Sequence, residues 1–109
     1  MPKIKALDMK FLDEVFQMEG GYVLDFSDRT MASFFSDELN IDIYDVQYAV
    51  NGTSKAKRLR SFLQAVDPQT AVRVLDVLWT YRAALRARSG EAEKVFNAHG
   101  RLLGLTDLL

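Results

Sequence analysis

The stretch DPQTAVRVLDVLWTYRAALRARSG, residues 67–90, predicts the longest helix of the chain and decides its fold class. Asp67 followed by Pro68 is typical of a helix start, because aspartate caps the first turn and proline suits the first helical position. Apolar side chains then recur at helical spacing. The buried face that they predict includes Ala71, Val72, Val74, Leu75, Leu78, Trp79, Tyr81 and Leu85. Ser89-Gly90 ends the pattern, and we expect a helix over 68–87.

The same spacing predicts shorter helices on both sides of this stretch. Toward the N-terminus they cover about 7–18, 28–39 and 54–66, with Ser27 and Ser54 as caps. Toward the C-terminus a last helix is expected over about 91–103. Its apolar side chains are Val95, Phe96, Leu102 and Leu103.

The secondary structure of two segments between these helices is not decided by the sequence pattern. Residues 20–26 and 40–45 fit either irregular loops or short extended segments, and a helical turn is expected over 45–50. If the extended segments paired as strands, the fold would be α+β. The short connections favour an all-α fold, a compact bundle of five to six helices in a single helical domain spanning 1–109.

The composition is that of an ordinary globular domain. The chain has 109 residues, of which 49% are apolar and 27% are charged. It has no cysteine, which excludes disulfides and thiolate metal sites and suits a reducing compartment. There is no signal-peptide pattern and no apolar run near the roughly 20 residues of a membrane helix. We expect a cytoplasmic protein with no membrane partner.

The charges are divided unequally along the chain. Residues 1–51 carry four basic and ten acidic side chains, a net of −6, whereas residues 52–109 carry ten basic and five acidic ones, a net of +5. The overall net charge of −1 hides this split. Separated charge on a small domain is typical of a surface that meets a complementary partner.

The most suggestive local pattern is GTSKAKRLR, residues 52–60. A turn and two hydroxyls precede a helix whose first turns carry four cations: Lys55, Lys57, Arg58 and Arg60. Backbone N–H groups at a helix start attract anions, and nearby cations strengthen that attraction. The pattern lacks the spacing of a phosphate-binding P-loop. A solvated charged face would give the same sequence.

Two arginines of the long helix, Arg82 and Arg86, extend this predicted basic surface. They project to the same sector as Trp79, so either the core ends there or guanidinium and indole share a contact surface. For Trp79 itself we expect a largely buried ring with a hydrogen-bonded indole N–H.

The acidic counterpart of this surface lies in the first half of the chain. It consists of Asp37, Glu38, Asp42 and Asp45 around an apolar segment. The set lacks the glycine and the closing glutamate of a calcium loop, and no nucleophile lies beside it. An acidic interaction surface or a solvated loop fits the pattern.

No residue pattern predicts catalysis. His99 is the single histidine, which excludes a two-histidine metal site, and no serine has a nucleophile-elbow context. We therefore expect no enzyme activity, no cofactor, no metal and no small-molecule substrate.

The runs DFSDRTMASFF (residues 25–35), ELNIDIY (38–44) and GTSKAKRLRSF (52–62) resemble small helical domains at the N-terminus of bacterial abortive-infection and related phage-defence proteins. The resemblance covers about residues 22–85. It implies a non-catalytic targeting or assembly module that precedes an effector or sensor module in a longer protein. Size, helix count and charge polarity also give a fold-level analogy to death-fold adaptors.

Together these observations predict a protein–protein interaction or adaptor domain in bacterial defence. It would self-associate or recruit an effector through its charged faces. The alternative is a nucleic-acid-binding module that uses residues 52–60, although the negative net charge disfavours it.

Overall fold

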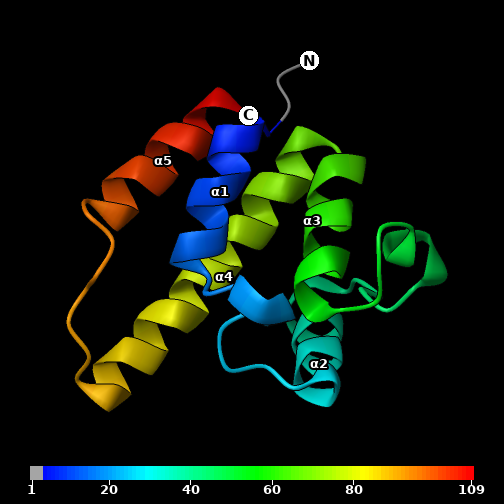
Figure 1. Ribbon diagram of the computed structural model, residues 1–109, viewed down its shortest axis with the longest axis horizontal. Coiled ribbons are helices and arrows are strands. Elements are labelled where there is room, and N and C mark those ends of the chain that lie inside the picture. Colours follow the sequence, from blue (N-terminus) through cyan, green and yellow to red (C-terminus); the bar gives the residue numbers. More distant parts are fainter. Residues whose placement is uncertain (1–3) are drawn as a thin grey trace.

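Seven helical segments make up the computed structural model, which describes residues 4–109 (Figure 1). In chain order they are α1 (Ala6–Val15), the 3₁₀ turn η1 (Glu19–Gly21), α2 (Asp28–Leu39), the 3₁₀ turn η2 (Val46–Ala49), α3 (Lys55–Ala65), α4 (Pro68–Ser89) and α5 (Ala98–Leu108). Within this range no residue is in a strand. The all-α prediction with five helices is therefore confirmed. The expected domain 1–109 begins with residues 1–3, which lie outside the described part.

The long helix α4 starts and ends for the reasons that its sequence indicates. The Asp67 side chain accepts hydrogen bonds from the Thr70 hydroxyl (2.5 Å) and backbone N–H (3.2 Å), and these bonds lower the pKa of Asp67. Pro68 occupies the first turn, and Gly90 closes the helix with a left-handed φ of 73°. The helix runs two residues beyond the predicted end at residue 87.

The packed face of α4 differs from the prediction at one end. Ala71, Val74, Leu75 and Leu78 are buried as expected, whereas Val72, Trp79, Tyr81 and Leu85 are half-buried. The large side chain fully enclosed next to them is Arg82, at 2% exposure. The apolar spacing predicts that apolar side chains fill this part of the core. The structure places the charged side chain of Arg82 there instead.

Helices α2 and α3 follow the predicted capping pattern. The Ser27 hydroxyl accepts from the backbone N–H of Thr30 (3.1 Å), and the Ser54 hydroxyl accepts from that of Lys57 (3.2 Å). These caps satisfy backbone donors that a first helical turn otherwise leaves without partners. The predicted ranges 28–39 and 54–66 are therefore confirmed to within a residue.

Helix α1 is shorter than the predicted range 7–18. It ends at Val15, and the chain reverses through Gln17, whose φ is 52°. Met18 then donates its backbone N–H to the Asp13 carbonyl (2.9 Å), which keeps Met18 in the core without a helix. Leu7 is 81% exposed and does not belong to the buried face.

The predicted last helix over 91–103 is wrong in its first half. Residues 91–97 are non-helical, and α5 begins only at Ala98. Side chains divert the segment: Arg86 donates to the Ala92 carbonyl (2.8 Å), and the Val95 N–H donates to the Glu93 carboxylate (3.0 Å). As a result Phe96 is 86% exposed.

The two ambiguous segments are ordered turns. Residues 20–26 and 40–45 contain no strand but bury three apolar side chains, Val23, Phe26 and Ile43. The turn expected over 45–50 is present as η2. These segments therefore add to the core without changing the all-α class.

Figure 1 shows α4 running diagonally across the molecule, with α5 along one side and α2, α3 and η2 toward the other. A single core lies between these elements and includes Leu12, Phe16, Met31, Phe35, Leu59, Phe62 and Leu78. The radius of gyration is 13.2 Å. A compact unit of this length is expected at about 13 Å, so the helices form one packed body.

Candidate functional site

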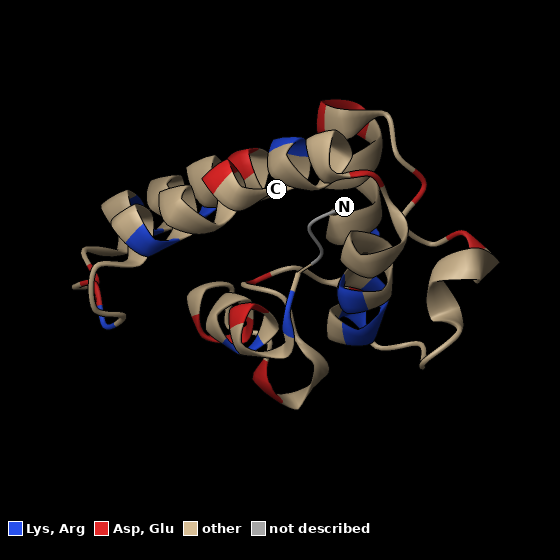
Figure 2. Cartoon of the chain, turned by 90° about the horizontal axis from the view of Figure 1, so that it is seen from above, with Lys and Arg blue, Asp and Glu red and all other residues tan. Residues whose placement is uncertain are grey.

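The basic segment predicted from residues 52–60 forms the first turns of α3, and Figure 2 shows Lys and Arg concentrated on that helix. Lys57 is exposed and has no ion pair among residues 4–109. Its stem lies directly across Gly52, where a Cβ atom would collide with the Lys57 Cδ. The Asn-Gly turn therefore leaves room for the stem of the lysine. Lys55 lies 5.2 Å from the centre of the Tyr22 ring.

Arg58 is less available than its place in the basic segment predicts. Its Nε donates to the Thr53 carbonyl (3.2 Å), and its guanidinium lies 4.6 Å from the centre of the Tyr44 ring. Tyr44 in turn donates its hydroxyl to Asp28 (2.6 Å). Burial, and then this bond to Asp28, raise the pKa of Tyr44 well above its ordinary value. Arg58 therefore holds the 40–45 segment against α3.

Arg60 connects α3 to α1. Its Nε donates to the Asp13 carboxylate at 3.0 Å, and both side chains are one-third exposed. An ion pair this exposed contributes at most about 1 kcal/mol. It nevertheless fixes the direction of the guanidinium along the surface between the two helices.

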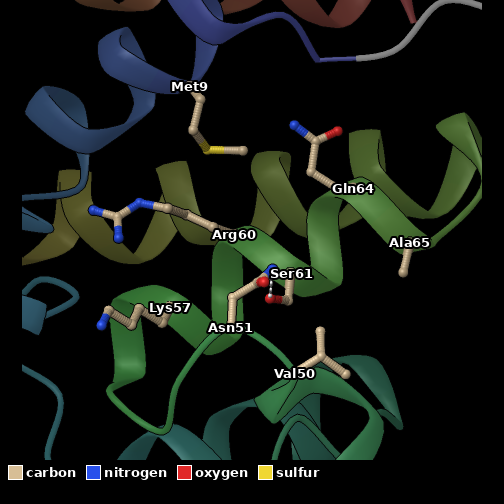
Figure 3. A pocket seen from close by; sticks show the side chains of 8 residues that line it. All are labelled: Met9, Val50, Asn51, Lys57, Arg60, Ser61, Gln64 and Ala65. Atoms are coloured by element: carbon tan, nitrogen blue, oxygen red, sulfur yellow. Dashed lines mark hydrogen bonds between the residues drawn. The ribbon is translucent and has the colours of Figure 1, made fainter.

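A hollow of about 510 Å³ lies along one face of α3 (Figure 3). Its floor is formed by Lys57, Arg60, Ser61, Gln64 and Ala65, and its walls are Met9 of α1 together with Val50 and Asn51 after η2. The floor therefore changes along α3 from two cations, through amide and hydroxyl groups, to alanine.

A second hollow of about 460 Å³ shares Lys57 and Arg60 with the first. Its remaining lining includes three carboxylates, those of Asp13, Glu14 and Glu19, together with Lys10. The two shared cations thus stand between a mixed apolar and polar hollow and a second one in which three carboxylates face three cations.

Arg82 does not belong to an interaction surface, which corrects the prediction. Its Nε donates to the Val15 carbonyl (2.7 Å), and its two terminal nitrogens donate to the Glu93 carboxylate at 2.7 and 2.8 Å. The Arg82 side chain is 2% exposed, whereas that of Glu93 is 38% exposed, so the pair reaches from the interior to the surface. Arg86 is mostly enclosed as well: its side chain is 15% exposed and lies 3.9 Å from Glu93.

Glu93 is the residue of this cluster that sequence reasoning missed. Hydrogen bonds from Arg82 hold the pKa of Glu93 down at about 2. No local pattern indicates this role, because the apolar spacing predicts a helix over 91–103. The same ion pair explains why two predicted surface arginines point inward.

Of the four predicted acidic residues, two are exposed on a helix and two accept hydrogen bonds from the backbone of a loop. Asp37 and Glu38 are exposed on α2. Asp42 accepts from the Tyr44 N–H (3.1 Å), and Asp45 accepts from the Gln47 N–H (3.1 Å). Since Tyr44 also touches Arg58, the acidic loop adjoins the start of α3. The two charged segments are therefore neighbours in the fold.

His99 and Trp79 form a stacked pair between α5 and α4, with ring centres 4.7 Å apart and planes 9° from parallel. Trp79 is half-buried and packs against the core, but the expected hydrogen bond of its indole N–H is not found in the described part of the chain. No group of three or more His, Cys, Asp or Glu side chains within residues 4–109 is arranged to hold a metal ion.

No protein-family model, curated protein sequence or solved structure matches this chain. None of the helices within residues 4–109 combines the length and the apolar composition needed to cross a bilayer.

Proposed function

We propose that this chain is a non-catalytic protein–protein interaction domain whose binding surface is centred on the exposed face of α3. The observation that carries the proposal is the position of Lys57 and Arg60, which line both hollows beside that helix. Lys57 is exposed, passes over Gly52 and has no ion pair in the described residues. An exposed cation without a partner at an open hollow is suited to meet a carboxylate of a partner.

Two kinds of protein partner fit this surface. A second copy of the chain could present the exposed Asp37 and Glu38 of α2. A separate effector or sensor protein could present an acidic surface of its own. The resemblance to N-terminal domains of phage-defence proteins supports the second, and it makes bacterial defence, in the cytoplasm, the setting that we propose.

A nucleic-acid partner is the second candidate, and one observation favours it. Lys55 and Lys57 lie in the first turn of α3 without ion pairs in residues 4–109, where phosphate oxygens would find cations and a helix N-terminus. Against it, Arg82 and Arg86 point inward, and three carboxylates offset the three cations of the second hollow. The surface therefore lacks the excess of positive charge that is typical of nucleic-acid binders, so we rank this candidate below a protein partner.

Matched charge reversals test the proposed function. Lys57→Glu changes the proposed surface, and Lys94→Glu makes the same change at an exposed position in the non-helical segment 91–97. We expect a complex, seen by sedimentation velocity or captured by crosslinking, that Lys57→Glu weakens and Lys94→Glu preserves. It should also weaken as salt rises above about 0.1 M, where charges are screened over about 10 Å.

Two results would contradict the proposal. One is a monomer at every salt concentration with no captured partner. The other is a complex that both reversals weaken equally, since that would reflect net charge alone. A mobility shift with single- or double-stranded DNA or RNA at low salt, lost in Lys57→Glu, would instead favour the nucleic-acid alternative.

A further inference from the structure

We infer that two copies of this chain form a symmetric dimer across a hollow of about 340 Å³ between α2 and α4. The hollow shares no lining residue with the two beside α3, so the inference goes beyond the proposed function. Two residues of α2 and four of α4 line it: Phe34, Glu38, Val77, Thr80, Tyr81 and Ala84.

The middle of the hollow is partly apolar and accessible. The rings of Phe34 and Tyr81 have their centres 5.1 Å apart, and both side chains are half-buried. Thr80 and Ala84 are exposed and short, so another helix can approach α4 closely there. The Thr80 hydroxyl already donates to the Asp76 carbonyl (3.1 Å), so covering it leaves no hydroxyl donor unpaired. Covering the two rings would remove apolar surface from water.

One end of the hollow carries a carboxylate. Helix α2 runs antiparallel to α4, because Arg73 donates to the Leu39 carbonyl (2.6 Å) and Phe34 meets Tyr81, two turns further along α4. Glu38 therefore marks the end of the hollow near the start of α4. It is exposed and has no ion pair within residues 4–109, since Arg73 uses the carbonyl instead.

A guanidinium lies beyond the opposite end. Arg88 follows Ala84 by four residues and Tyr81 by seven, which places it on the same side of α4. Burial, and then the bond to Asp25, raise the pKa of Tyr81 to about 12, and the charge of Arg88 opposes this rise. Arg88 is exposed and makes no ion pair in the described part of the chain.

Two-fold symmetry makes the two ends complementary. A two-fold dimer uses the same surface on both copies, and with antiparallel α4 helices it brings each end of the hollow to the opposite end of the other copy. The rotation exchanges the ends but keeps the sides. A crossing beside Ala84, about halfway between Val77 and Arg88, therefore brings Arg88 of each copy toward Glu38 of the other.

The order of charges favours a second copy as the occupant. Glu38 and Arg88 are opposite charges at opposite ends of one partly apolar hollow, so the surface is complementary to itself. Each contact would form twice in the dimer. A separate partner would have to reproduce the same order of charges along its own surface.

A charge swap tests the dimer. Sedimentation equilibrium of the intact chain should show a concentration-dependent dimer. Glu38→Arg and Arg88→Glu should each raise its dissociation constant about tenfold, because each reversal turns two attractive contacts into repulsive ones. The double variant exchanges the two charges and should restore the affinity of the parent chain. Lys57→Glu is the matched control on α3 and should leave the dimer unchanged.

A steric variant tests the hollow without changing any charge. Ala84→Tyr fills the hollow and should weaken the dimer about tenfold. Because Ala84 is exposed, the larger side chain has room outside the core of the monomer. Ala92→Tyr adds the same side chain at an exposed position of the non-helical segment and should have no effect. Circular dichroism would show that each variant keeps its helices.

Several outcomes would overturn the inference. A parent chain that stays monomeric up to about 1 mM would exclude the dimer. A dimer that Ala84→Tyr leaves intact, or that the double charge swap does not restore, would exclude this surface. A monomeric parent chain that captures another protein through Arg88 would identify a separate partner as the occupant.

The same variants separate this inference from the proposed function. If Lys57→Glu dissolves the dimer and Arg88→Glu preserves it, the second copy binds at α3, so the proposed function stands and this inference fails. If the dimer depends on Arg88 and no complex depends on Lys57, the inference stands and the proposed α3 surface fails.

Discussion

The carboxylate of Glu93 receives both terminal nitrogens of the Arg82 guanidinium, at 2.7 and 2.8 Å. Arg82 is 2% exposed and comes from the middle of α4, whereas Glu93 comes from the non-helical segment that follows that helix. This bidentate pair anchors residues 91–97 to α4. It also compensates the one fully enclosed charge of the described residues.

Removing the Glu93 carboxylate should destabilise the fold. Glu93→Ala leaves the enclosed Arg82 guanidinium with the Val15 carbonyl as its one hydrogen-bond partner in the described residues, beside the Trp79 ring at 4.8 Å. We expect the free energy of unfolding to fall by about 1–3 kcal/mol, the cost of leaving a buried charged group without hydrogen bonds. Urea denaturation would measure it. Glu91→Ala is the matched control, and an equal loss there would contradict the importance of the pair.

The same pair predicts a defined loss of stability in acid. The pKa of Glu93 in the folded chain is about 2, below its ordinary value of 4.5. A lowered folded-state pKa stabilises the fold above the unfolded pKa, and this contribution is lost as pH falls from 4.5 toward 2. Unfolding measured across this range should show a smaller decline in Glu93→Gln than in the parent chain. Parallel declines would contradict the assignment.

The helices could be predicted because their signals are local. The helix starts are set by three caps, in which a side chain accepts from a backbone N–H three residues later. The capping residues are Ser27, Ser54 and Asp67. The start of α5 and the burial of Arg82 could not be predicted in this way. They depend on a bidentate pair eleven residues apart and on a carbonyl from α1, 67 residues away.

The candidate site was predictable only in part. Lys57 and Arg60 stood out because they lie in a dense basic run, but the run did not indicate which cations remain available. That depends on Thr53, Tyr44 and Asp13, which come from the turn, the acidic loop and α1. The walls of the hollow, Met9 and Val50, carry no sequence signal because tertiary packing alone brings them beside α3.

Trp79, which stacks on His99, should contribute less to the free energy of unfolding than a fully buried tryptophan would. We expect Trp79→Ala to lower the free energy of unfolding by about 2 kcal/mol, below the roughly 3–5 kcal/mol of a core tryptophan, because the ring is half-buried. His99→Ala should cost about 0.5–1.5 kcal/mol, the value of an aromatic pair. Thermal unfolding of the two variants would measure both. An unfolded Trp79→Ala chain would restore the core interpretation.

Gly52 is expected to control both the stability of the turn and the position of Lys57. Its φ of 139° is rarely adopted by residues with a side chain, and a Cβ atom there would collide with the Lys57 stem. Gly52→Ala should therefore cost about 1–3 kcal/mol in urea denaturation, the range for strained backbone. Gly104→Ala is the control, since a Cβ atom at Gly104 meets no neighbour and alanine favours the helix by about 1 kcal/mol. In a folded Gly52→Ala chain, the displaced lysine keeps its charge, so partner binding should weaken less than in Lys57→Glu. Unchanged stability together with unchanged binding would show that Gly52 does not hold Lys57 in place.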